Sequence, residues 1–96
     1  LIRNIGIFIN KYNFYIIGEQ CVKCNQNLIG VRGTTLDSIK EVYSHPQGFA
    51  QCSEFLAKHP DWNLVECSST SEAACLVAKK ASADSVAIAS ELAASI

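Results

Sequence analysis

One stretch of the chain gathers side chains that could do chemistry. Residues 42–52, VYSHPQGFAQC, bring together a hydroxyl, an imidazole, two amides and a thiol. They lie where a short apolar strand, residues 41–44, gives way to a segment of helical periodicity, residues 46–58. Polar side chains at a helix N-terminus suit a carboxylate or phosphate ligand, because the first backbone N–H groups have no helical partner. A thiol near an imidazole would instead suggest a nucleophile with its base.

The same residues also make an ordinary helix start. Ser44 and Gln47 have the S-x-x-Q spacing of a capping box, in which the hydroxyl accepts from the amide of Gln47 and the Gln side chain reaches back. Pro46 suits the first helical turn, where its missing N–H has no partner. Cys52 falls on the apolar stripe of the helix, so we expect it to be packed and not ionised. A nucleophilic pair of Cys52 with His45 is the less favoured alternative.

Two further helix starts follow predicted strands. Ser69–Glu72 is a second capping box, S-x-x-E, after the strand at 63–67, and Ser90 is a plausible N-cap after the strand at 85–89. In an open parallel sheet the carboxyl ends of the strands lie along one edge, so the three helix N-termini should point into one crevice. Their free amides and hydroxyl groups would suit a carboxylate or phosphate ligand there.

The elements that position these starts alternate along the chain. Strands are predicted at 14–22, 26–31, 41–44, 63–67 and 85–89, and helices at 1–11, 46–58, 70–81 and from 90 onward. Alternating units of this length indicate an α/β fold. We expect a single domain over residues 1–96, with a mostly parallel sheet, an added antiparallel strand and helices packed on it in a three-layer-like arrangement.

Composition narrows the classes of partner. The 8 basic and 9 acidic residues form no run of one sign, so nucleic acid is not an expected partner. No apolar stretch approaches the ~20 residues that span a bilayer, so we expect a soluble protein without a membrane partner. Five cysteines, an odd number, fit a reducing compartment, and we expect the cytoplasm. The chain begins at Leu1 and stops at Ile96, which suggests a piece of a longer polypeptide.

Other motifs are weaker. Cys21 and Cys24 form a CxxC, but a strand would place them on opposite faces, and neither histidine has metal-ligand spacing to them. Residues 30–35, GVRGTT, lack the GK[ST] ending of a phosphate loop. They are better explained as a loop before a short helical turn, with Thr34 or Thr35 as the cap. We therefore expect no metal and no cofactor.

In three motifs the chain resembles the catalytic domain of prephenate dehydratase. The motifs are Tyr43–Gln47 followed by Gln51 and Cys52, then Ser69–Ala74, and finally Val86–Ser90. The likeness extends over nearly the whole chain, and the SHPQ-x-x-x-QC spacing is specific. Enzymes of this family convert prephenate to phenylpyruvate, with loss of water and carbon dioxide, on the route to phenylalanine.

The resemblance implies a two-lobed catalytic domain like a type II periplasmic binding protein, with substrate between the lobes. This chain resembles the second lobe, so the first lobe would be a partner that lies outside it, and the fragment alone should be inactive. An isolated lobe should also self-associate, and we expect a homo-oligomer. A non-catalytic module of the same fold that binds a small carboxylate is the alternative.

The resemblance also implies which residues serve the reaction. Ser44 and Gln51 match positions that line the substrate pocket and are the expected catalytic residues. The expected substrate-binding residues belong to the three helix starts: Ser44, His45, Pro46, Gln47, Gln51, Cys52, Thr70, Ser71 and Ser90.

Overall fold

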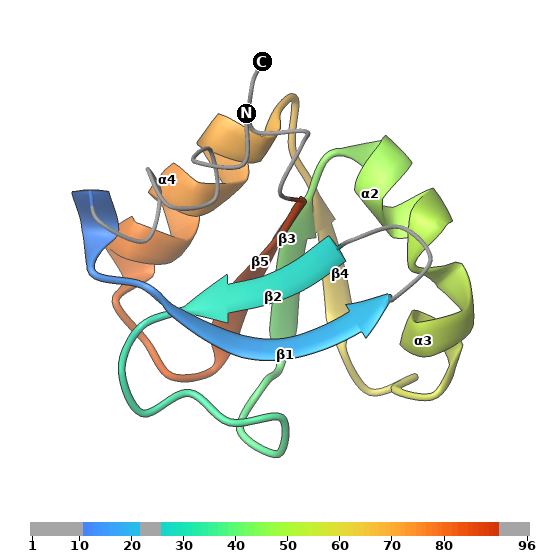
Figure 1. Cartoon of the computed structure of the whole chain (residues 1–96), viewed down its shortest axis with the longest axis horizontal. Helices are drawn as coiled ribbons and strands as arrows, with labels where there is room; N and C mark the ends of the chain where they lie inside the picture. The colour runs from blue at the N-terminus through green and yellow to red at the C-terminus, as the bar shows by residue number, and fades with distance from the viewer. Residues whose placement is uncertain (1–10, 22–25, 91–96) are drawn as a thin grey trace.

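A mixed sheet forms the centre of the molecule (Figure 1). The computed structural model describes residues 11–21 and 26–90. Within them the sheet has five strands, in the order β1-β2-β5-β3-β4. The strands are β1 (Tyr15–Cys21), β2 (Gln26–Gly30), β3 (Glu41–Ser44), β4 (Asn63–Glu66) and β5 (Ser85–Ser90).

The direction of the strands confirms the predicted sheet. β3 pairs in parallel with both β4 and β5, whereas β2 pairs antiparallel with both β1 and β5. β1 therefore points the same way as the three parallel strands, and β2 is the added antiparallel strand. Tyr15–Cys21 and Glu41–Ser44 agree with the predicted strands to within one residue or better.

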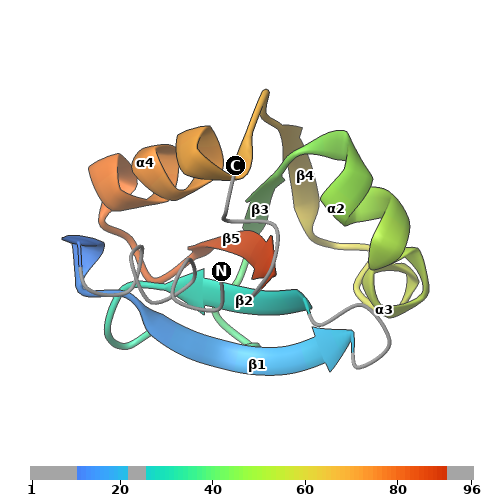
Figure 2. The same cartoon turned by 45° about the horizontal axis from the view of Figure 1, so that its top comes forward.

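Helices cover both faces of the sheet and make three layers (Figure 2). α2 (Pro46–Gln51) and α3 (Ser53–Ala57) lie on one face, and α4 (Thr70–Lys80) lies on the other. Neighbouring strand residues point to opposite faces. Thus Val42 packs in the cluster beneath α2 and α3, while Tyr43 packs in the cluster beneath α4. Because both faces are covered, the central strand β5 carries a continuous apolar run, Val86–Ala89, whose residues pack alternately in the two clusters.

The helix predicted over residues 46–58 is divided at Cys52. Cys52 has φ −104° and ψ 14°, outside the helical region, and it separates α2 from α3. The N–H of Cys52 still bonds to the carbonyl of Gly48 at 3.1 Å, and the N–H of Leu56 to the carbonyl of Cys52 at 2.9 Å. The apolar stripe consequently continues across the break, which is why periodicity alone predicted one helix.

Two local predictions about loops agree with the structure. Asn13, just beyond the helix predicted at 1–11, has φ 58°, a left-handed conformation that Asn tolerates and that ends a helix. The rest of that helix, residues 1–10, lies outside the described residues. In the loop after β2, the hydroxyl of Thr35 accepts from the N–H of Ser38 at 3.2 Å, so Thr35 is the cap. Gly33 supplies the positive φ of 93° that this loop requires.

An ion pair ties the end of α4 to the sheet at the amino end of β3. Glu41 Oε1 accepts from the hydroxyl of Tyr43 at 3.0 Å and forms a salt bridge with Lys80 in the last turn of α4. The bond from Lys80, and next that from Tyr43, lower the pKa of the Glu41 carboxyl. Burial, and then the hydrogen bond to Glu41 and its negative charge, raise the pKa of the Tyr43 hydroxyl.

This ion pair predicts a pH dependence of folding stability. A carboxyl whose pKa is lower in the folded state stabilises the fold above its unfolded pKa of about 4.5, and the contribution is lost as the pH falls through the folded value. Glu41→Gln should therefore reduce the loss of unfolding free energy between about pH 6 and pH 3 in urea titrations. Glu54→Gln, on the exposed side of α3, is the control. Identical pH slopes for the native protein and Glu41→Gln would contradict the assignment.

Candidate functional site

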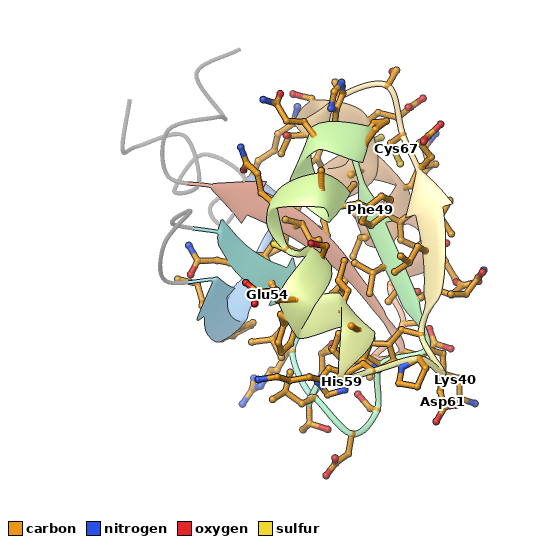
Figure 3. All side chains as sticks on the ribbon, turned by 90° about the vertical axis from the view of Figure 1, so that its right-hand side faces the viewer. Lys40, Phe49, Glu54, His59, Asp61 and Cys67 are labelled. Atoms are coloured by element: carbon orange, nitrogen blue, oxygen red, sulfur yellow. The ribbon has the colours of Figure 1, made fainter. Side chains whose placement is uncertain are left out.

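The carboxyl ends of the parallel strands place two helix starts at one edge of the sheet. Ser44, the last residue of β3, stands in register with Glu66, the last residue of β4. The N–H of Cys67 then donates to the carbonyl of Ser44 at 2.8 Å, which fixes the two strand ends together. In Figure 3 Cys67 lies at this edge, while Lys40, His59 and Asp61 lie at the opposite end of the molecule.

This edge has the topology of a ligand site. The chain leaves β3 toward α2 on one face and leaves the neighbouring β4 toward α4 on the other face. Ligands of open α/β sheets bind at the edge where the connections from two adjacent strands leave toward opposite faces of the sheet. The first two helix starts thus lie at the same edge of the sheet, and the crevice expected between them stays a prediction. The third start follows Ser90, the last described residue, so its helix lies outside the described residues.

The first helix start differs from the predicted capping box. The N-cap is His45 and not Ser44: the His45 Nδ1 accepts from the N–H of Gln47 at 3.0 Å. Pro46 explains the shift, because its ring fixes a helical φ and forces the preceding residue into the extended region. His45 accordingly has φ −62° and ψ 147°. Gln47 is then the second helical residue, too early for the reciprocal bond of a capping box.

The cap also determines which nitrogen of the His45 ring carries the hydrogen. Since Nδ1 accepts a hydrogen bond, this geometry assigns the proton of a neutral ring to Nε2. The His45 side chain is exposed, so Nε2–H faces solvent as a donor. The exposed side of α2 thus offers an imidazole N–H beside the amide groups of Gln47 and Gln51, which lie four residues apart on the same side of the helix.

Ser44 and Cys52, in contrast, lie inside the protein. Ser44 is 1% exposed, and its hydroxyl donates to the carbonyl of His45 at 2.8 Å. Cys52 is 3% exposed and packs in the core cluster with Leu56 and Trp62. The structure thus uses His45 as a cap and Cys52 as a core residue, which does not favour a nucleophilic pair. Residues 11–21 and 26–90 contain no group of three His, Cys, Asp or Glu residues that could hold a metal ion.

The second helix start has the predicted N-cap, Ser69, but the Glu72 side chain bonds to a different residue than a capping box requires. The hydroxyl of Ser69 accepts from the N–H of Glu72 at 3.0 Å, as predicted. The Glu72 carboxylate, however, accepts from the N–H of Ser68 at 2.6 Å and from its hydroxyl at 3.0 Å. These bonds, the backbone one first, lower the pKa of Glu72. Thr70 is half-buried and Ser71 is exposed in this first turn.

The cap on α4 predicts a measurable loss of stability. Ser69→Ala removes the acceptor for the N–H of Glu72 and should lower the unfolding free energy by about 1 kcal/mol. Ser71→Ala, two residues into the same helix, is the matched control and should change stability by less than about 0.5 kcal/mol. Urea unfolding of both variants measures the difference. Equal losses would show that the Ser69 hydroxyl does not cap the helix.

Cys67 is a residue at this edge that the motifs did not single out. It follows β4 directly, is buried, and its thiol donates weakly to the carbonyl of Val65 at 3.8 Å. Burial, and then the negative charge of Glu72, raise the pKa of the Cys67 thiol. Cys67 therefore stays protonated at neutral pH and contributes packing and a backbone bond to the site, not a nucleophile. Its position at the end of the strand predicted at 63–67 was the only signal in the sequence.

The chain is similar to a protein family and to several individual proteins. The family model described as prephenate dehydratase matches residues 2–96. The bifunctional chorismate mutase/prephenate dehydratase of Escherichia coli (strain K12) is 42% identical over 91 residues, which are 94% of this chain and 23% of that protein. The enzyme of the same name from Buchnera aphidicola subsp. Acyrthosiphon pisum is 36% identical over 91 residues, 95% of this chain and 24% of that protein.

Two further matches are more distant in sequence or shorter. The prephenate dehydratase of Methanocaldococcus jannaschii is 39% identical over 64 residues, 67% of this chain and 22% of that protein. A solved structure of GqqA, described as a novel type of quorum quenching acylase, superposes with a TM-score of 0.64 at 29% identity, covering 85% of this chain and 30% of that chain. The chain thus spans about a quarter of the length of the curated relatives it matches.

The described residues include no helix long and apolar enough to cross a membrane.

Proposed function

Because the chain belongs to the prephenate dehydratase family, we propose that it is the substrate-binding second lobe of an enzyme that converts prephenate to phenylpyruvate. The observation that carries this proposal is the family match over residues 2–96, with the SHPQ-x-x-x-QC motif at the carboxyl edge of the sheet. The activity belongs to the full-length protein, with a first lobe as partner. The proposed full-length enzyme would act in phenylalanine biosynthesis in the cytoplasm.

The chemistry of the substrate suits the donors at the first helix start. Prephenate carries two carboxylates, and N–H donors from imidazole and amide groups bind a carboxylate through charge-assisted hydrogen bonds. His45, Gln47 and Gln51 supply such donors on the exposed side of α2. α2 has only six residues, so few aligned peptide dipoles add to them. We therefore assign carboxylate binding mainly to these side chains, with Pro46 fixing the turn that presents them.

The second and third helix starts supply the remaining contacts of the proposed site. Thr70 and Ser71 place a hydroxyl group each in the first turn of α4, and Ser90 ends β5 on the same edge. A hydroxyl group can donate a hydrogen bond either to a carboxylate or to the departing hydroxyl of the substrate. Cys52 supports the site from the core, where it packs below α2.

The reaction itself needs little covalent help from the protein. Loss of water and carbon dioxide is driven by formation of the aromatic ring, so positioning of the substrate and stabilisation of developing charge should dominate. Gln51 is the proposed donor to the departing hydroxyl or to a carboxylate, and Ser44 is the second proposed catalytic residue. Acyl transfer, the chemistry named for GqqA, is less well supported. The Ser44 hydroxyl donates to the His45 carbonyl, and the His45 Nδ1 accepts from a backbone amide, so His45 does not activate this serine.

The proposal is tested by phenylpyruvate formation from prephenate in the full-length protein, beside the 96-residue chain alone. We expect activity only in the full-length protein. Binding of prephenate without turnover by the full-length protein would instead support the non-catalytic binding module. Absence of both binding and turnover would refute the proposal.

We further propose that copies of the protein associate. Exposed apolar side chains lie on the edge strands β1 and β4 and in the loop after β2: Tyr15, Ile16, Leu36 and Leu64. Edge strands with exposed apolar residues favour pairing or packing with another copy. Sedimentation of the full-length protein should show an oligomer, and a strictly monomeric profile at high concentration would contradict this.

A further inference from the structure

Gly48 occupies a position where the backbone does not require glycine. It is the third residue of α2 and, unlike Gly33, has no positive φ. Alanine would be the better helix former there. The structure shows a different reason for glycine: a Cβ at this position would collide with the hydroxyl oxygen of Ser44. The next neighbours, Ile88 Cγ2 at 3.5 Å and Ser44 Cβ at 3.6 Å, would be in ordinary van der Waals contact.

The obstacle is thus one hydroxyl group, and that group is held by a hydrogen bond. Ser44 Oγ donates to the carbonyl of His45 at 2.8 Å, and the same carbonyl accepts from the N–H of Gly48 at 2.9 Å. The hydroxyl therefore fills the space that a side chain at position 48 would take. In this position Ser44 is 1% exposed, although it ends β3 at the edge that carries the site.

We propose that Gly48 is a positioning residue for Ser44: by lacking a side chain, it lets the hydroxyl turn inward to the His45 carbonyl. Substrate must then compete with that carbonyl for the hydroxyl. This inference rests on the proposed function, in which Ser44 serves the substrate. A side chain at position 48 expels the hydroxyl into another staggered rotamer and removes the competition.

The kinetic test is a cycle of four full-length proteins: native, Gly48→Ala, Ser44→Ala and the double variant. Gly48→Ala should lower the KM for prephenate by about 2- to 10-fold, the equivalent of one net hydrogen bond, with kcat changed less than about 2-fold. In the Ser44→Ala background the same substitution should leave KM unchanged, because the colliding atom is gone. An equal change in both backgrounds, or no change in either, would overturn the proposal.

Thermal unfolding of the same four proteins tests the contact without using activity. In the Ser44→Ala background Gly48→Ala should raise Tm by about 2–4 °C, since alanine restricts the unfolded chain and favours helix. In the protein that keeps Ser44, Gly48→Ala should raise Tm less or lower it, because the expelled hydroxyl loses its hydrogen bond to the His45 carbonyl. If the native protein does not turn over prephenate, the proposed function fails, yet this cycle still decides whether Gly48 places the hydroxyl. Equal Tm shifts in both backgrounds would refute that.

Discussion

Replacing Gln51 with alanine in the full-length protein should lower kcat for prephenate by about 10²- to 10³-fold, the effect of removing one donor that stabilises transition-state charge. This corresponds to ~3–4 kcal/mol of barrier. Gln51 is the last residue of α2 and is exposed, so the fold should survive the change. Steady-state phenylpyruvate formation gives kcat, and circular dichroism with the unfolding midpoint verifies the fold.

The matched control is Glu54→Ala, an exposed residue one turn further on in α3. It should leave kcat within about 2-fold of the native value, since surface changes away from a site are usually small. Near-normal turnover by Gln51→Ala would remove Gln51 from the catalytic residues. A loss of kcat that is equal in both variants would point to disturbance of the α2–α3 segment instead.

Ile29→Ala should be the more damaging of two matched core substitutions, with a loss of unfolding free energy of about 2–5 kcal/mol. Ile29 lies on β2, is 0% exposed, and packs in the core cluster beneath α4. Truncation leaves a cavity between sheet and helix as well as losing the buried methyl and methylene groups. Urea unfolding with a constant m-value measures the loss directly.

The control for Ile29 is its own partner in the neighbouring strand. Ile16 on β1 stands directly opposite Ile29 in the register, yet it is 49% exposed. Ile16→Ala should therefore cost less than about 1 kcal/mol, chiefly through weaker β propensity. Equal losses in the full-length protein would mean that Ile16 is covered there, either by another lobe or by the copy with which the edge strands are proposed to pack.

Sequence reasoning predicted the elements well where the signal was local and repeated. The strand Glu41–Ser44 was predicted with the correct bounds because a proline follows it closely. The start of β4 at Asn63 is marked by a preceding turn, and the start of α4 at Thr70 by its capping residue. The family was also recognisable from short motifs, as the match over residues 2–96 confirms. Both results depend on residue types at fixed spacing.

The errors at the site arise from interactions that spacing does not encode. The motif S-x-x-Q predicted a cap at Ser44, but the ring of Pro46 moved it to His45, and only the imidazole nitrogen made that cap possible. The break at Cys52 depends on the ψ of one residue, and the apolar stripe passes over it unchanged. The inward rotamer of Ser44 depends on the missing side chain at Gly48, four residues away.

The carboxylate of Glu72 limits where a substrate with two negative charges can bind on this lobe. It already sits at the start of α4, held by the N–H and hydroxyl of Ser68, with its pKa lowered so that it stays ionised. Like charges at close range repel, so a second anion there would meet repulsion as well as occupied donors. Under the proposed function, this lobe binds one carboxylate of prephenate through the uncharged donors at the α2 start, and the hydroxyl groups of Thr70 and Ser71 serve the departing hydroxyl. We expect cationic groups of the first lobe to receive the other carboxylate.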